Sequence, residues 1–148
     1  EFEDFNFKCE VLVGEKGNSG IYLRGIYEVQ VSDTYGQPLD PHNMGGIYSR
    51  IAPTSAAEKP AGEWQTYDII FEGPRFKEGK LEKPAVVTVL HNGVIAQHRR
   101  EILGRGTHKQ VATYAPHAPA GPLSLQDHGN PVRFRNIWVR ELKGYDEK

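Results

Sequence analysis

Apolar and polar residues alternate with a period of two along most of the chain, and no segment has the three-to-four-residue spacing of an amphipathic helix. The alternation predicts strands at 5–11, 64–71 and 132–142, and a shorter one at 123–126. Many short strands joined by turns rich in Gly and Pro predict an all-β sandwich or jelly roll.

Two hairpins can be predicted together with their registers. Residues 85–98 turn at Asn92-Gly93, a favoured pair for a two-residue turn. Residues 21–31 turn at 24–26, because this register collects the apolar side chains of both strands on one face. The predicted pairs are Leu90 with Ile95, Val89 with Ala96, Leu23 with Tyr27, and Ile21 with Val29. The opposite face of the second hairpin then carries Tyr22, Glu28, Gln30 and, at its end, Arg24.

Two long irregular stretches, 32–62 and 104–122, separate these strands. Loops of this length are uncommon inside a compact domain and usually serve a function. His42 lies in the first and His117 in the second, so either imidazole is placed to close over a site.

Composition narrows the classes of function. A chain of 148 residues predicts a single domain over residues 1–148. Its net charge of −1 gives no field that would attract nucleic acid or an anionic membrane, and no apolar run is long enough to span a bilayer. The lone Cys9 excludes an internal disulfide and a cysteine-based zinc site. No spacing typical of metal ligands occurs, so we expect no cofactor, although an oxygen-ligated calcium ion stays open.

The segment 28–33 is the first candidate for chemistry. On a strand, Glu28 and Gln30 project from one face about 7 Å apart. A bulge after Gln30 would turn Asp33 onto the same face. Carboxylates held on a rigid strand suit acid–base work on a sugar. The alternative is a solvent-facing polar edge.

The second candidate is the corner that follows residues 123–126. Gln126 ends this short strand, and Asp127 and His128 come next, so both side chains reach a strand end where sites often lie. Histidine is a side chain that can act as acid or base near neutral pH, so His128 is a candidate for either role. The alternative is a turn in which Asp127 bonds to nearby backbone.

Two further side chains have competing interpretations. Trp64 can stack on a sugar ring, but most aromatic residues of a small sandwich belong to its core. His91 precedes a hairpin turn, where a structural hydrogen bond competes with a role in substrate binding.

Four ordered blocks resemble the 3-keto-disaccharide hydrolase domain family. They are Gly17–Val31 with its sequence GNSGIYLRG and YEVQV, Gly62–Phe71, Val87–Val94, and Gly121–Trp138 with its sequence GPLSLQDHG and VRFRNIW. Together they span most of the chain, which makes the resemblance more specific than any single motif.

The resemblance implies a concanavalin-like jelly roll of two antiparallel sheets that acts on glycosides oxidised to a ketone at C3. It also implies export by a bacterium, to the periplasm or outside the cell. Family domains usually begin with further strands, so the chain is expected to be short at its N-terminus. The exposed sheet edge would then be covered by a partner segment or by a second copy.

For the implied chemistry, Glu28 or His128 would be base or acid, with Arg24 as the third catalytic residue. The expected substrate-binding residues are Tyr22, Gln30, Asp33, Trp64, His91, Gln126 and Asp127. Related glucanases carry an E-x-D-x-x-E pattern, and here its spacing persists as Glu28, Gln30 and Asp33. The amide at the centre weakens a double-displacement mechanism and favours elimination.

Two other functions stay open at this point. A non-catalytic carbohydrate-binding module would use the same face without forming product. A conventional glycosidase would need a second carboxylate about 5 to 9.5 Å from Glu28, and Asp33 or Asp127 would have to supply it.

Overall fold

A computed structural model describes residues 1–104 and 114–143 of the chain. The strands are β1 (Phe5–Val13), β2 (Asn18–Leu23), β3 (Tyr27–Ser32), β4 (Trp64–Glu72), β5 (Arg75–Lys77), β6 (Lys80–Lys83), β7 (Ala85–His91), β8 (Val94–Ile102), β9 (Ser124–Leu125) and β10 (Val132–Glu141). Those ranges hold no helix, and so none that could cross a membrane. The predicted all-β class is confirmed.

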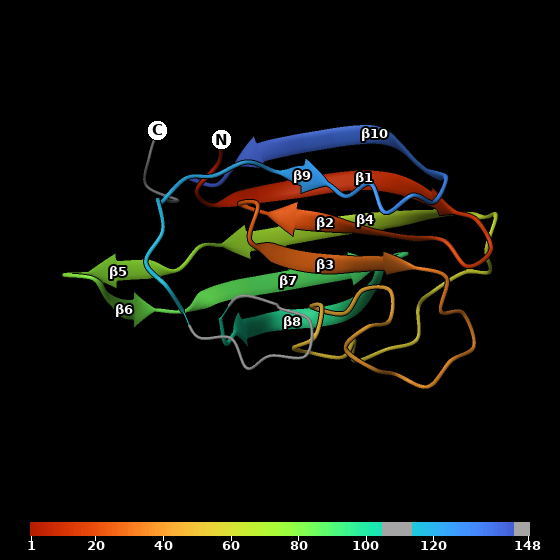
Figure 1. The fold of residues 1–148 in the computed structure, drawn as a ribbon, viewed down its shortest axis with the longest axis horizontal. Coiled ribbons are helices and arrows are strands. Elements are labelled where there is room, and N and C mark those ends of the chain that lie inside the picture. Colours follow the sequence, from red (N-terminus) through yellow and green to blue (C-terminus); the bar gives the residue numbers. More distant parts are fainter. Residues whose placement is uncertain (105–113, 144–148) are drawn as a thin grey trace.

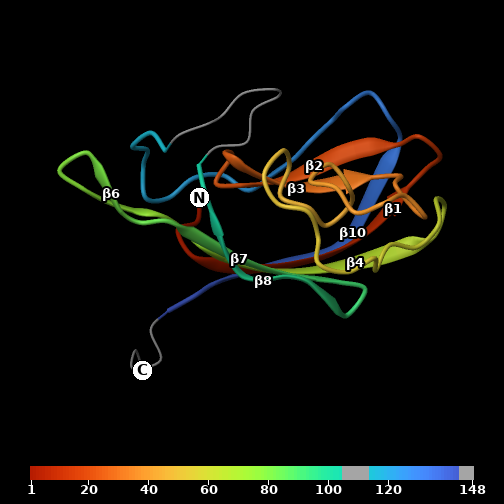
Figure 2. The same cartoon turned by 90° about the horizontal axis from the view of Figure 1, so that it is seen from below.

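Two antiparallel sheets pack face to face as a sandwich. The large sheet has the strand order β10-β1-β4-β7-β8, and the small sheet has the order β3-β2-β9. Figure 1 shows the small sheet in front of the large one, and Figure 2 shows the two layers from the side. Phe5, Phe7 and Ile69 of the large sheet meet Ile21 and Val29 of the small sheet in the core. This apolar burial stabilises the jelly roll that the alternation predicts.

The register predicted for β2 and β3 is confirmed. Leu23 pairs with Tyr27 and Ile21 with Val29, with the turn at residues 24–26 between them. Because the period of a strand is two, this register sends the remaining side chains of both strands to the outer face. The small sheet therefore has one face in the core and one polar outer face.

The hairpin of β7 and β8 is confirmed in outline but not in its full register. Leu90 pairs with Ile95 as predicted, whereas Val89 pairs with Gln97 instead of Ala96. The extra residue buries both Ala96 and Gln97. The register shifts because the Gln97 amide donates a 3.0 Å hydrogen bond to the carbonyl oxygen of Ala52 in the long loop.

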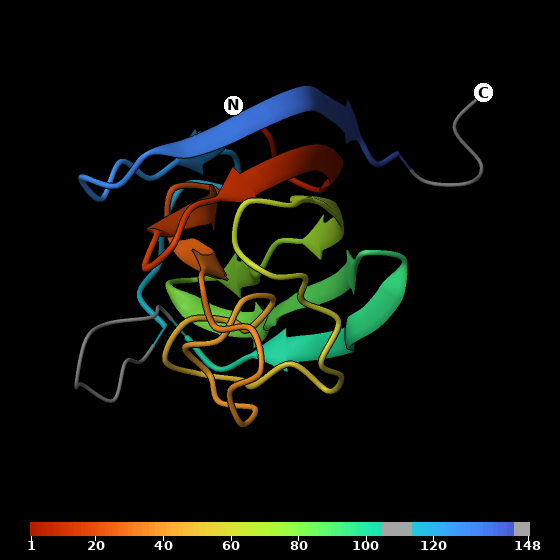
Figure 3. The same ribbon diagram turned by 90° about the vertical axis from the view of Figure 1, so that its right-hand side faces the viewer.

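The long segment between β3 and β4 closes one side of the sandwich (Figure 3). Ile47 forms an antiparallel bridge with Val29 of β3, and Tyr48 donates its backbone N–H to the carbonyl of Glu28 at 3.0 Å. Farther on, the backbone N–H of Thr54 donates to the carbonyl of Ala96 in β8 at 2.8 Å. The segment thus extends the small sheet beyond β3 and then crosses to the large one.

The two-stranded ribbon of β5 and β6 was not predicted, and it projects from one end of the sandwich in Figure 1. Its strands are three and four residues long and largely exposed. Such short strands bury too little apolar surface to leave a clear alternation in the sequence. Of the predicted loop 104–122, residues 105–113 lie outside the described ranges.

Candidate functional site

The outer face of the small sheet is polar across all three of its strands. Three rows cross it, because Glu28 pairs with Tyr22, Gln30 with Gly20, and Ser32 with Asn18. On β9, Ser124 lies beside Tyr22, and the backbone N–H of Gln126 donates to the carbonyl of Gly20 at 2.9 Å. We call this surface the polar face; it comprises Asn18, Gly20, Tyr22, Glu28, Gln30, Ser32, Ser124 and Gln126.

Glu28 lies flat across the polar face because residue 20 is a glycine. A Cβ at position 20 would collide with the carboxylate oxygen Oε1 of Glu28. The missing side chain therefore gives the carboxylate its place over the sheet. In this position Glu28 is only 8% exposed, although its neighbours on the face are polar.

Burial dominates the electrostatics of Glu28. It raises the pKa of the carboxyl above its ordinary value, while a hydrogen bond with Tyr22 and the charge of His128 partly oppose the rise. The Tyr22 hydroxyl in turn accepts a 3.3 Å hydrogen bond from the side-chain amide of Gln126, which directs the Tyr22 proton toward Glu28. A buried carboxyl with a raised pKa is typical of groups that transfer protons.

Two buried acceptors on the polar face have no partner in the described part of the chain. They are Oε1 of Gln30, whose side chain is 4% exposed, and Oδ1 of Asn18. An unsatisfied buried carbonyl oxygen costs free energy, and native proteins usually satisfy it with a ligand or water. Each oxygen could accept a hydrogen bond from a hydroxyl group.

Of the predicted site residues, five belong to this group: Tyr22, Glu28, Gln30, Gln126 and His128. The first four are on the polar face, and His128, at its β9 side, is close enough to act on the charge of Glu28. Asn18 also lies on the polar face but was not among the residues predicted from the sequence. The position of Asn18 opposite Ser32 follows from the predicted register, so the alternation could have found it.

Asp33 and Asp127 instead hold turns. Strand β3 pairs without the bulge that would have turned Asp33 toward Glu28, and Asp33 accepts a 2.9 Å hydrogen bond from the backbone N–H of Lys16. Asp127 accepts a 2.9 Å hydrogen bond from the backbone N–H of Gly129, which is the turn interpretation considered above. The prediction that Asp33 joins Glu28 on one face is wrong.

Arg24 does not share the polar face with Glu28. Residue 24 has left the strand and adopts a φ of 54°, so alternation no longer fixes its direction. Its side chain is buried, donates from Nε to the carbonyl of Glu3 at 3.1 Å and lies 3.9 Å from the carboxylate of Asp4. The predicted grouping of Arg24 with Glu28 is therefore wrong.

His91 and Trp64 also lie away from the polar face. His91 is inside the sandwich, where it stacks on Tyr67 at 4.9 Å and its Nε2 lies 2.9 Å from Oε1 of Gln65. Burial lowers the pKa of His91 to about 4. Trp64 projects from the outer face of the large sheet, where the guanidinium of Arg135 lies 3.8 Å from its ring centre. Neither residue is placed to bind a substrate beside Glu28.

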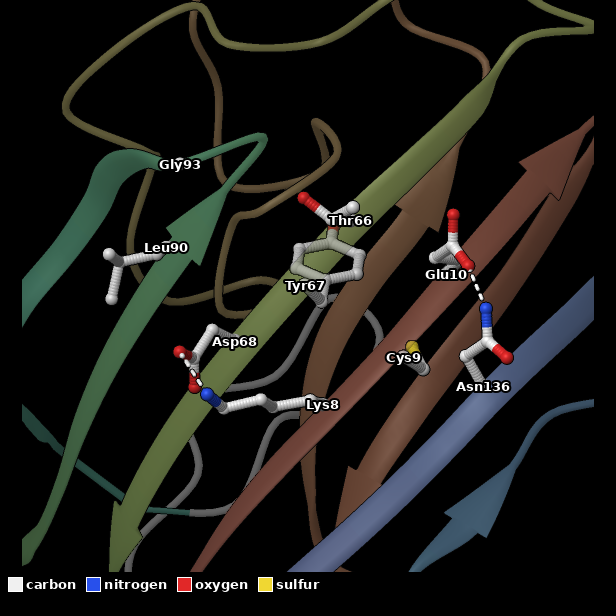
Figure 4. Close-up of a pocket in the computed structure, with 9 residues that line it drawn as sticks. All are labelled: Lys8, Cys9, Glu10, Thr66, Tyr67, Asp68, Leu90, Gly93 and Asn136. Carbon is white, nitrogen blue, oxygen red and sulfur yellow. Dashed lines mark hydrogen bonds and ion pairs between the residues drawn. The ribbon is translucent and has the colours of Figure 1, made fainter.

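The outer face of the large sheet has a shallow hollow of about 340 Å³ (Figure 4). Its charged side chains are paired with one another: Lys8 lies 3.4 Å from Asp68, and Glu10 binds Arg135 at 3.1 Å and also Asn136. Unlike Glu28, the two acids of this hollow, Glu10 and Asp68, each form an ion pair and remain partly exposed. For metals, residues 1–104 and 114–143 contain no group of three or more His, Cys, Asp or Glu placed to hold an ion.

Comparison with known proteins adds a family to this geometry. The model of the 3-keto-alpha-glucoside-1,2-lyase-like domain matches residues 1–140. A crystal structure from Parabacteroides distasonis ATCC 8503, provisionally described as a glycosyl hydrolase, is 40% identical with a TM-score of 0.86, covering 95% of this chain. The chain spans 65% of that protein, just under two thirds. A search of curated proteins finds no match.

Two more structures from the same organism, with the same provisional description, share the fold. The first is 20% identical with a TM-score of 0.63, and the match covers 96% of this chain and 73% of that one. The second is 19% identical with a TM-score of 0.65, and the match covers 95% of this chain and 79% of that one.

Proposed function

The chain belongs to the family of 3-keto-alpha-glucoside-1,2-lyase-like domains, and from this premise we propose that it cleaves 3-keto-glycosides by removing the C2 proton and expelling the C1 substituent. The observation that carries the proposal is the buried carboxyl of Glu28, whose pKa is raised and which has a hydrogen bond with Tyr22 and is acted on by the charge of His128. A carboxylate taken out of water is a stronger base than an exposed one.

The reaction needs a base for the C2 proton and hydrogen-bond donors for the enolate oxygen. A ketone at C3 acidifies the hydrogen on C2, and Glu28 takes that proton while the C2–H electron pair forms an enolate with C3. The enolate then reforms the ketone, a double bond forms between C1 and C2, and the C1–O bond breaks. Addition of water across the new double bond converts elimination into net hydrolysis.

The residues around Glu28 would bind the sugar and stabilise the enolate. The unpartnered oxygens of Gln30 and Asn18 accept hydrogen bonds from sugar hydroxyls. His128, whose charge acts on Glu28, would balance the charge of that carboxylate and donate to the developing enolate oxygen. Tyr22 would hold the carboxylate in place through its hydrogen bond.

A conventional glycosidase fits the same face less well. It requires a second carboxylate across from Glu28. The two candidates, Asp33 and Asp127, hold the turns at Lys16 and Gly129. Elimination needs one base and no second carboxylate, which agrees with the arrangement around Glu28.

The test is incubation of the protein with the 3-keto and the native form of one disaccharide. We expect a 2-hydroxyglucal-type product, or its hydrate, from the 3-keto form alone. Saturable sugar binding without product would identify a binding module and contradict the proposal, and equal turnover of the native form would identify a conventional glycosidase.

A further inference from the structure

We propose that His42, held by Asp40, is the general acid that protonates the departing C1 oxygen; this rests on the proposed function above. Nδ1 of His42 lies 2.6 Å from Oδ1 of Asp40, and the backbone N–H of His42 donates to the same oxygen at 2.8 Å. These hydrogen bonds hold the pKa of Asp40 below its ordinary value. Because a carboxylate only accepts hydrogen bonds, Nδ1 of His42 carries the hydrogen. Nε2 is the ring nitrogen that Asp40 does not engage.

His42 lies at the rim of the polar face, on the side of the long loop. Its carbonyl accepts a 3.3 Å hydrogen bond from Oγ of Ser32, a residue of that face. Its ring meets the ring of Tyr48 edge-on at 5.1 Å, and Tyr48 is hydrogen-bonded through its backbone to Glu28. These contacts place His42 beside the β3 edge of the polar face, opposite the β9 edge where His128 lies.

The long loop that carries His42 also encloses a cavity, although His42 itself is not among the residues that line it. The following residue, Asn43, lines this cavity of about 310 Å³, which also has Tyr35, Leu39 and Met44 in its wall. Tyr35 and Leu39 are among the exposed large hydrophobic side chains of the protein. Aromatic and aliphatic walls with a few polar groups are typical of small-molecule sites, and they suit a sugar or aryl substituent that leaves from C1.

The proton balance assigns His42 one step. In the imidazolium form both ring nitrogens carry hydrogen, with Nδ1 bound to Asp40 and Nε2 free to donate. When the enolate collapses and the C1–O bond breaks, the oxygen keeps the bonding pair and takes the Nε2 proton. The leaving group departs as a neutral alcohol, and the neutral imidazole regains a proton from water.

The test compares two 3-keto-glucosides that differ in their need for an acid. A methoxide leaving group requires protonation, whereas 4-nitrophenolate does not. We expect His42→Asn to lower kcat/KM on the methyl glucoside about 10²- to 10³-fold, and on the 4-nitrophenyl glucoside less than about tenfold. The same change at His98, an exposed residue of β8, is the matched control and should alter neither value.

Asp40 is a positioning residue in this scheme, and Asp40→Asn should show the same dependence on the leaving group with a smaller loss, about tenfold. His42 and Asp40 are both exposed, so the variants should fold, and thermal unfolding checks that they do. A purely structural role would lower turnover of both substrates equally.

Two results would overturn the assignment of His42. Equal losses on the two glucosides, or no loss on either, would remove it as the acid while leaving the function intact, provided that the wild type still forms product. Failure of the wild type to cleave either 3-keto-glucoside would overturn the proposed function, and the role of His42 with it.

Discussion

The outer faces of the two sheets carry charged residues in opposite settings. On the large sheet, Lys8 and Asp68 lie 3.4 Å apart with side chains 51% and 34% exposed, so water and the partner satisfy both. On the small sheet, Glu28 is buried over a glycine, and the oxygen of Gln30 beside it has no partner in the described ranges. Both faces arise from the same strand alternation.

The difference between the faces indicates where a ligand is needed. Exposed ion pairs contribute little free energy and gain little from a new partner. A desolvated acid and an unsatisfied amide oxygen, by contrast, lower the stability of the empty protein, and a bound sugar would compensate them. We therefore propose the small sheet as the functional face, although a hollow of about 340 Å³ lies on the outer face of the large sheet.

The largest expected effect separates the two faces by activity. Glu28→Gln keeps the shape of the side chain but removes the base, so turnover of a 3-keto-glucoside should fall about 10²- to 10⁴-fold. Asp68→Asn is the matched carboxylate-to-amide change on the large sheet and should stay within about twofold. Product formation followed by NMR measures both.

Full turnover by the Glu28→Gln variant would remove Glu28 from the mechanism. A comparable loss in the Asp68→Asn variant would show that the large sheet takes part in the reaction, and the contrast between the faces would fail.

Gly20→Ala sharpens the argument about the placement of Glu28. The new methyl group occupies the position of the Glu28 carboxylate, which must move aside. Because misplacing a reacting group by about 1 Å can cost 10²-fold, we expect a loss of about 10- to 100-fold in kcat. The end of a side chain can yield, so the midpoint of thermal unfolding should change little. Unaltered kcat would show that the close approach is irrelevant.

Glu28→Gln should lower activity but raise the free energy of unfolding. Folding raises the pKa of Glu28, so the native state disfavours the ionised form. At pH 7 the variant should therefore be more stable than the wild type, by about 1 kcal/mol. This advantage should disappear as the pH falls through the raised pKa toward about 4.3, the ordinary value for glutamate. Urea unfolding at several pH values measures it, and a destabilised variant at pH 7 would contradict the burial argument.

The smallest effect is expected on the large sheet. Lys8→Ala removes the ion pair with Asp68 and a cation 5.5 Å from the ring centre of Trp138. Both contacts are exposed, so the free energy of unfolding should change by less than about 1 kcal/mol and turnover should not change. A clear loss of sugar cleavage would give this face a role that its paired charges do not indicate.

Much of the polar face could be predicted from the sequence because it depends on local alternation. With the turn at residues 24–26, the period of two places Tyr22, Glu28 and Gln30 on one face, as the structure shows. The sequence also predicts the short strand around Gln126. That this strand lies beside β2, at the edge of the polar face, is shown only by its pairing in the structure.

The residues whose positions were predicted incorrectly are those that depend on contacts with distant parts of the chain, which strand alternation does not determine. Arg24 lies in a turn with positive φ, so its direction depends on the distant residues Glu3 and Asp4. Trp64 alternates as predicted, but the pattern does not reveal which sheet its outer face belongs to. The predicted pairing of Val89 with Ala96 is wrong because the Gln97 amide forms a hydrogen bond with the long loop. That tertiary contact leaves no signal in the local pattern.

The fate of the C2 hydrogen tests the central claim most directly. A 3-keto-glucoside labelled with deuterium at C2 would be incubated with the protein in ordinary water, and the sugar product analysed by mass spectrometry. Removal of that hydrogen by Glu28 predicts a product without the label, whereas a product that retains the deuterium would show that the C1–O bond breaks without chemistry at C2.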